Sequence, residues 1–385
     1  MVVSYLQDLT WISLLLIVGL IISFISLKLK IPQIFLLIIT GALFSSFISL
    51  PASFLAGLSI FALILIVFDS VSKIKASEIL NISPKAIKLT LLFLIANLIF
   101  LSLFTNFLFF EGINTNSIIM CLIFAALMSG TDPATTLTIF KDQKSKLIEI
   151  LKIESIVNTP LNVIIPLILI NVYQGIFEAQ IVLKTFLQSI MTGVGSGVVI
   201  GLIIFGLMRK KYSENLSPIV ILASALISYS LAENLGGNGI LSVTSLAVVY
   251  SISTLKEKTN LGKFTSVFAM LLRIIVFILL GLVIRIPLET NFIFKTIVLF
   301  LIYLIIRFIV VKISFRELPF KNIMFMSLNA PKGVATAVVI FILSGLDIQG
   351  ISTIINLSFA FVIYSVFLET FTARFSTKLI KNDKS

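Results

Sequence analysis

The sequence has 385 residues, of which 58% are hydrophobic and 12% are charged. A soluble domain has about 25% charged residues, so this chain has too few charges to cover a water-facing surface, and the composition indicates a membrane protein. The single cysteine, Cys121, excludes an internal disulfide, and the absence of histidine leaves carboxyl groups to carry proton chemistry near neutral pH. The net charge of +12 does not indicate nucleic-acid binding, because most basic residues lie in short loops between apolar segments.

Thirteen apolar runs follow one another along the chain, and most approach the roughly 20 residues that a helix needs to cross the hydrocarbon core. Backbone groups inside lipid must be paired within the segment, and the runs lack the alternation typical of β-barrel strands, so we predict helices. The predicted fold is an all-α polytopic membrane protein with 13 transmembrane helices, in a single membrane domain over residues 1–385. The runs are Leu9–Leu27, Pro32–Ser49, Pro51–Val71, Ala86–Asn106, Ser117–Phe140, Leu147–Val172, Val182–Leu207, Leu216–Leu231, Gly239–Leu255, Phe264–Ile284, Phe292–Val311, Ile323–Leu343 and Thr353–Phe371.

The basic residues are distributed unevenly between the gaps that separate these runs. Of the 29 lysines and arginines, 23 lie in or beside the odd-numbered gaps and in the C-terminal tail, whereas the even-numbered gaps contain only Lys184, Arg285 and Lys295. Cytoplasmic loops are enriched in lysine and arginine. We therefore expect a multi-pass protein of the cell membrane with its N-terminus outside and its C-terminus in the cytoplasm.

Several ionisable residues lie inside the apolar runs, where a charge is costly and usually functional. Two of them stand beside helix breakers, in Ser129–Pro133 of the fifth run and in Asn329–Gly333 of the twelfth. These runs cross the membrane in opposite directions, and interrupted helices at matching places in two inverted halves indicate a transporter site. We expect Asp132 to face the N-terminal ends of the broken helices and Lys332 the C-terminal ends; two proline kinks relieved by packing are the alternative. The six residues are Asp69, Asp132, Glu154, Arg273, Arg307 and Lys332.

Two of these charges lie at similar depths in the membrane. Glu154 is seven residues inward from Leu147, about 10 Å at the rise of a helix, and Arg307 is roughly 6–9 Å from the cytoplasmic end of its run. A buried glutamate without a cation would be protonated instead. We therefore predict a Glu154–Arg307 ion pair and favour a structural role for it, because breaking such a pair is strongly destabilising.

The polar motifs together resemble a known family of membrane proteins. Residues 130–135 (GTDPAT) followed by 154–158 (ESIVN) resemble the NhaP type of sodium/proton antiporter, in the monovalent cation:proton antiporter superfamily. Further matches are Arg273 followed by 277–281, the Arg307 helix, and 330–334. The resemblance implies two inverted six-helix repeats, approximately 9–172 and 216–371, joined by a linking helix at 182–207. It also implies crossed discontinuous helices, a mobile core beside a dimerisation domain, and a homodimer.

The resemblance also implies roles for single residues. Glu154 and Arg307 match the family's structural ion pair, and Lys332 and Arg273 are assigned to ion pairing and helix-dipole compensation. The ion-binding residues of the family match Thr131, Asp132, Ser155 and Asn158. Two positions depart from the pattern: Lys332 stands where arginine is usual, and Thr159 stands where the family has the aspartate that binds both the proton and the cation. Threonine cannot ionise.

Three functional hypotheses follow from this departure. The first is exchange of a monovalent cation (Na⁺ or Li⁺, with K⁺ left open) for protons by alternating access, with a relocated acid. Asp132 is the first candidate for that acid and Asp69 the second, although Asp69 also fits a simple interfacial acid. Oxygens of Thr131, Ser155, Asn158 and Thr159 would replace the water shell of the cation.

The second hypothesis is a non-transporting relative kept for binding, sensing or assembly. The third is an uncoupled pathway for another ion. An enzyme is not expected, and neither is a cofactor or a metal beyond the transported cation. The glycines at 193, 195, 197 and 201 lie in an apolar run and indicate close helix packing, not a nucleotide loop. The expected partners are monovalent cations, protons and membrane lipid.

Overall fold

The chain folds into a bundle of helices of very different lengths. The computed structural model describes residues 2–29, 33–48, 50–74, 76–110, 112–132, 145–175, 179–210, 213, 215–255, 257–284, 287 and 289–380, and every regular element in these ranges is helical. The elements are α1 (Val2–Leu29), α2 (Gln33–Phe44), α3 (Ala52–Ser72), α4 (Ala76–Ala96), the π-helix η1 (Asn97–Leu101), α5 (Ser102–Phe109), α6 (Thr115–Ser129), α8 (Lys146–Tyr173), α9 (Ala179–Lys210), α10 (Ser217–Asn234), α11 (Gly239–Ile252), α12 (Lys258–Val283), α13 (Thr290–Ser314), α14 (Phe320–Leu328), α15 (Val334–Ser344) and α16 (Ile351–Ile380).

Each of the 13 predicted runs contains helix, so the prediction of an all-α polytopic membrane protein is confirmed. Within the described residues, seven helices are long and apolar enough to cross a membrane by length and composition. The total of 13 spanning helices stays a prediction. The fourth run differs in detail, because η1 interrupts it with a π-helical turn between α4 and α5. The fifth run is described only to Asp132, and its second half lies outside the described residues.

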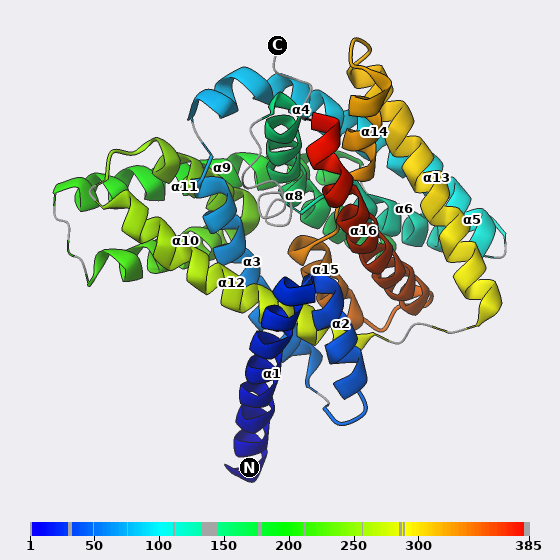
Figure 1. Ribbon diagram of the computed structural model, residues 1–385, viewed down its shortest axis with the longest axis horizontal. Coiled ribbons are helices and arrows are strands. Elements are labelled where there is room, and N and C mark those ends of the chain that lie inside the picture. Colours follow the sequence, from blue (N-terminus) through cyan, green and yellow to red (C-terminus); the bar gives the residue numbers. More distant parts are fainter. Residues whose placement is uncertain are drawn as a thin grey trace.

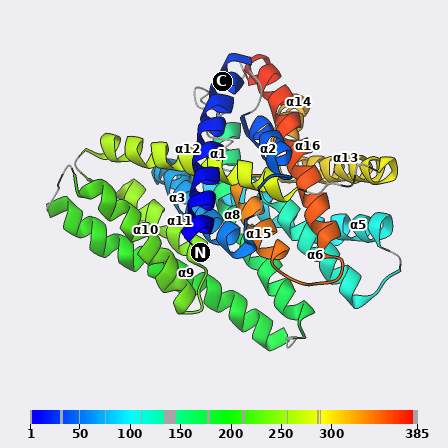
Figure 2. The same ribbon diagram turned by 90° about the horizontal axis from the view of Figure 1, so that it is seen from below.

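The helices form two groups on either side of a central layer. Helices α9, α10 and α11 pack against one another on one side, and α5, α6, α13 and α16 lie on the other (Figures 1 and 2). Between them, α3 packs against α11, α12 and α15, while α8 packs against α4 and α6. Apolar side chains on the outer helices are highly exposed, as for Phe107 (83%) and Leu202 (63%), which fits a surface covered by lipid.

Three of the four clustered glycines of α9 lie where this helix touches α11. A Cβ atom added at Gly197 would lie 2.0 Å from the backbone oxygen of Ser242, and one at Gly201 would lie 2.9 Å from Cβ of Val249. A Cβ at Gly193 would approach the Asn238 backbone oxygen to 2.8 Å. Only at Gly195 does the added atom find nothing within 4 Å among the described residues. Close packing through small residues, expected from the sequence, therefore holds for Gly193, Gly197 and Gly201.

This arrangement predicts opposite effects for two neighbouring alanine substitutions. Gly197→Ala should lower the free energy of unfolding by about 1–3 kcal/mol, because the new methyl group meets backbone that cannot move aside easily. Gly195→Ala is the matched control and should be neutral or stabilising by up to about 1 kcal/mol, through helix propensity alone. Thermal unfolding of both variants in detergent checks the prediction. Equal melting temperatures for the two variants would contradict the α9–α11 contact.

Candidate functional site

The two interrupted segments meet in the interior. Helix α6 ends at Ser129, and the chain is extended at Gly130, with φ −72° and ψ 151°. Helix α14 ends at Leu328, and non-helical residues 329–333 lead to α15. The backbone N–H of Asp132 donates to the backbone oxygen of Pro331 over 2.9 Å. Helix α6 therefore ends at the predicted break, residues 329–333 interrupt the twelfth run, and the two breaks are in direct contact.

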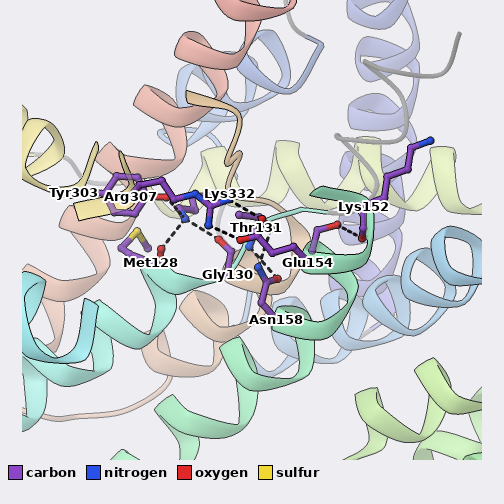
Figure 3. A network of polar contacts seen from close by, with 10 residues as sticks. Met128, Gly130, Thr131, Lys152, Glu154, Asn158, Tyr303, Arg307 and Lys332 are labelled. Atoms are coloured by element: carbon purple, nitrogen blue, oxygen red, sulfur yellow. Dashed lines mark hydrogen bonds and ion pairs between the residues drawn. The ribbon is translucent and has the colours of Figure 1, made fainter. Parts of the chain in front are cut away.

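Lys332 lies at the C-terminal end of α6. Its Nζ donates hydrogen bonds of 2.7 Å to the backbone oxygens of Met128 and Gly130 and to the hydroxyl of Tyr303, and the side chain is fully buried (Figure 3). Carbonyl groups at a helix end have no partner in the helix and carry a partial negative charge. The Lys332 ammonium therefore compensates the broken end of α6, at the position expected from the sequence.

Asp132 lies at the N-terminal end of α15. Its side chain is 3% exposed, and it packs so closely on Gly333 that a Cβ added there would lie 2.1 Å from the Asp132 Cγ. Gly333 precedes the first residue of α15, where free N–H groups favour a negative charge. The carboxylate thus faces a helix start and the lysine a helix end.

Thr131 and Asn158 form a buried hydroxyl–amide pair beside Asp132. Asn158 Nδ2 donates to Thr131 Oγ1 over 2.8 Å, and Asn158 Oδ1 accepts from the Thr131 backbone N–H over 3.2 Å (Figure 3). This pair joins α8 to the end of α6. It places two side-chain oxygens next to the Asp132 backbone, in a setting suited to a desolvated cation.

The other two oxygen donors expected on α8 are turned toward their own helix. Ser155 Oγ donates to the backbone oxygen of Lys152 over 2.7 Å, and Thr159 Oγ1 donates to the backbone oxygen of Ser155 over 2.6 Å. Both side chains are buried. Each hydroxyl proton is therefore used within α8, while the oxygen lone pairs stay available to a ligand.

Glu154 and Arg307 form a bidentate ion pair between α8 and α13. Arg307 Nη1 contacts Glu154 Oε1, and Nη2 donates to Oε2 over 2.7 Å (Figure 3). Both residues are fully buried, and the guanidinium lies 4.5 Å from the centre of the Phe93 ring. The two charges compensate each other, so the structure brings together the two residues that the depth argument paired.

Asp69 does not join this crossing. Its Oδ2 pairs with Lys73 Nζ over 2.6 Å, and its Oδ1 accepts from Thr265 and Ser266 over 3.1 and 3.0 Å. These contacts join α3 to the start of α12. Arg273 lies half-buried further along α12, outside the contacts described above. The acid ranked second from the sequence is thus part of a separate, helix-joining cluster.

Several residues of the site were missed by the sequence analysis. Tyr303 accepts from Lys332, and Asn162 approaches Thr336 Oγ1 to 3.3 Å, one helical turn beyond Asn158. With its amide nitrogen facing α6, Asn162 donates to two backbone oxygens near the end of that helix. Glu369 on α16 is a buried carboxyl. Of these, only Glu369 had a signal in the sequence, as an ionisable residue within an apolar run.

Comparison with known proteins identifies the family. Residues 12–378 match the family model described as the transmembrane sodium/hydrogen exchanger. The chain belongs to this family. The predicted resemblance to NhaP-type antiporters is thereby confirmed.

Individual relatives of this exchanger agree with the assignment. It is 26% identical to the probable Na⁺/H⁺ antiporter 2 of Methanocaldococcus jannaschii, over 72% of the chain and 69% of the relative. It is 28% identical to the Na⁺/H⁺ antiporter NhaH of Halobacillus aidingensis, over 65% of the chain and 66% of the relative. The match to the low-affinity Na⁺/H⁺ antiporter NhaS1 of Synechocystis reaches 34% identity but spans only 24% of that protein.

The fold is also that of a solved antiporter. The structure of the sodium proton antiporter MjNhaP1 from Methanocaldococcus jannaschii superposes with a TM-score of 0.82, covering 98% of this chain and 99% of the other. At 20% identity this likeness shows the fold alone.

Proposed function

We propose that this exchanger moves a monovalent cation, Na⁺ or Li⁺ with K⁺ left open, against protons across the cell membrane. The buried Asp132 carboxylate at the crossing of the two broken helices carries this proposal. A single carboxylate that binds either a proton or a dehydrated cation couples the two fluxes, because the two ligands compete for the same oxygens. The relatives named above, all described as Na⁺/H⁺ antiporters, support the same activity.

The surroundings of Asp132 support cation binding. Lys332 is held by three oxygens at the end of α6, and Arg307 is held by Glu154. Thr131 and Asn158 supply neutral oxygens for the cation's coordination shell. Asp132 is sealed from solvent at 3% exposure, so ions reach it only after a conformational change that opens one side at a time.

The larger architecture belongs to the same proposal. The chain would consist of two inverted repeats, 9–172 and 216–371, with 182–207 as the link, and a mobile core that contains the crossing would move relative to a dimerisation domain. The proposed exchanger is a homodimer with its N-terminus outside and its C-terminus in the cytoplasm. Helices α9, α10 and α11 pack mainly against one another and against α3, to one side of the helices around the crossing (Figure 1), and this supports a division into a static and a mobile part.

Flux measurements in proteoliposomes test the proposed exchange. With a pH-sensitive dye inside, an external pulse of Na⁺ or Li⁺ should dissipate an imposed pH gradient, and parallel pulses of K⁺ define the cation selectivity. Protein-free liposomes are the control. A correctly folded protein that moves no protons in response to any of the three cations would contradict the proposal.

The Thr159→Asp variant separates exchange from the non-transporting alternative. The alternative was motivated by Thr159, and nothing in the comparisons supports it. We expect the natural chain to exchange ions, and Thr159→Asp to keep exchange with a changed pH dependence, because it adds a carboxyl one helical turn from Ser155. A silent natural chain together with an active Thr159→Asp variant would establish the alternative instead.

A further inference from the structure

An apolar groove runs between α13 and the unit formed by α4, η1 and α5. It has a volume of about 500 Å³, and every residue that lines it is aliphatic or a phenylalanine. Helices α5 and α13 lie at the edge of the molecule opposite α9–α11 (Figures 1 and 2). Its lining includes highly exposed side chains such as Ile305 (58%) and Ile95 (52%). In a membrane protein such apolar surface is covered by lipid, so the groove opens toward the hydrocarbon of the bilayer.

The helices on the two sides of the groove run in opposite directions. Near one end of the contact, the Arg307 guanidinium of α13 lies 4.5 Å from the centre of the Phe93 ring of α4. Near the other end, the ring centres of Phe109 in α5 and Phe292 in α13 lie 5.7 Å apart. Residue numbers that rise from α4 to α5 therefore lie opposite numbers that fall along α13.

The length of the groove is close to the depth of one leaflet of the bilayer. Its lining extends from Leu92 of α4 to Phe104 of α5, which is about 18 Å at the rise of a helix. One leaflet of hydrocarbon is about 15 Å deep, half of the bilayer core. On α13 the lining extends from Ile302 to Ile313, so Leu92 and Ile313 mark the same end. The groove can therefore hold an acyl chain along one leaflet.

Exposed basic residues stand at the Leu92–Ile313 end of the groove. This basic end consists of Lys85 and Lys88 of α4, Lys312 of α13, and Arg316 just beyond α13. Lys88 precedes Leu92 by one helical turn, so it continues the lining stripe of α4. None of the four basic residues forms an ion pair within the described part of the chain. They outnumber Glu317, the acid that follows them, so the basic end carries a net positive charge.

We propose that this groove binds an anionic phospholipid of the cytoplasmic leaflet, with an acyl chain between α13 and α4–α5 and the phosphate at the basic end. The distribution of lysine and arginine predicts that this end faces the cytoplasm, where anionic lipids attract basic side chains. A neutral lipid would fill the groove but leave the basic end without an anion. A free anion would occupy the basic end but leave the groove unfilled. An anionic lipid matches both features.

A lipid in the groove contacts the helices that hold the buried ion pair. Ile306 lines the groove beside Arg307, and Leu92 lines it beside Phe93, whose ring the guanidinium faces. A ligand that binds only the folded state stabilises that state. Bound anionic lipid should therefore keep α4 against α13 and raise the melting temperature of the protein in detergent.

The first test removes charge from the basic end and measures lipid retention by native mass spectrometry of the full chain in detergent. The probes are phosphatidylglycerol and phosphatidylcholine with the same acyl chains. We expect the natural chain to retain phosphatidylglycerol in preference to phosphatidylcholine, and Lys88→Gln/Lys312→Gln to bind it roughly 30-fold more weakly. The matched control is Arg209→Gln/Lys210→Gln, which removes two exposed basic residues at the end of α9 and should behave as the natural chain.

The second test fills the groove. Ile99→Trp/Ile309→Trp places two large rings at half-exposed lining positions, and Leu202→Trp on the exposed surface of α9 is its control. We expect the double variant, but not the control, to lose the bound phosphatidylglycerol and the rise in melting temperature that this lipid gives. Glycerol 3-phosphate, which has the phosphate but no acyl chain, should leave the melting temperature unchanged.

Three results would overturn the inference. Equal retention of the two lipids by the natural chain, or of phosphatidylglycerol by all the variants, would mean that the lipid is bound without selection by this groove. Stabilisation by glycerol 3-phosphate as large as that by phosphatidylglycerol would mean that the groove takes no part. Conversion of a dimer into monomers by Ile99→Trp/Ile309→Trp, seen by size-exclusion chromatography with light scattering, would make the groove an interface between two copies of the chain instead.

Discussion

Asp132→Asn should abolish cation-dependent proton movement in proteoliposomes. Asparagine fits the same space, but it can neither release a proton nor neutralise a bound alkali ion. Asp132 is buried at the crossing and packs on Gly333 at the start of α15, so no solvent ion can replace its charge. We expect the response to Na⁺ and Li⁺ pulses to fall to the level of liposomes without protein, while the fold and the melting temperature stay close to those of the natural chain.

Asp69→Asn is the matched control for this experiment. Asp69 is as buried as Asp132, at 3% exposure, but it pairs with Lys73 and accepts from Thr265 and Ser266 away from the crossing. We expect this variant to lose some stability and to keep ion exchange. Undiminished flux in Asp132→Asn, measured beside an active Asp69→Asn, would show that the acid of the exchange lies elsewhere.

Much of the fold follows from local features of the sequence. The length and apolarity of each run predict a helix, since lipid leaves the backbone no other partner. The broken helices were predictable because proline and glycine stand beside polar residues in two otherwise apolar runs, Ser129–Pro133 and Asn329–Gly333. The Glu154–Arg307 contact followed from depth, because the rise of a helix is fixed and each charge needs a buried partner.

Other features depend on packing that local patterns do not encode. Tyr303 and Ser365 are uncharged residues in otherwise apolar helices, so nothing in the local sequence marks them. Their hydrogen bonds to Lys332 depend on how α13 and α16 are rotated in the bundle. The π-helical turn at Asn97–Leu101 shifts the hydrogen-bond register without any proline or glycine to mark it. Glu369 is different, because it is an ionisable residue inside an apolar run, which is the feature that selected Asp132. It was missed because it lies near the end of its run, where a charged side chain is typical of the membrane interface.

Loss of one partner from the Glu154–Arg307 pair should produce the largest loss of stability. We expect Arg307→Met to lower the free energy of unfolding by about 3–5 kcal/mol, because it leaves the Glu154 carboxylate buried without its cation. The contact of the guanidinium with the Phe93 ring is lost as well. Glu154→Gln should lower the free energy of unfolding by a similar amount, because it leaves the Arg307 guanidinium buried without its carboxylate. Thermal or chemical unfolding of the purified variants in detergent measures these losses.

The double variant Glu154→Gln/Arg307→Met tests what the pair does. Without either charge there is no unpaired ion to bury, so the double variant should be more stable than the sum of the single losses predicts, and more stable than Arg307→Met alone. If the pair only joins α8 to α13, this folded double variant keeps cation-driven proton flux. Additive losses would show that the two side chains act independently. A stable double variant without flux would mean that the two charges also shape the electric field at Asp132, and would place the pair within the exchange mechanism.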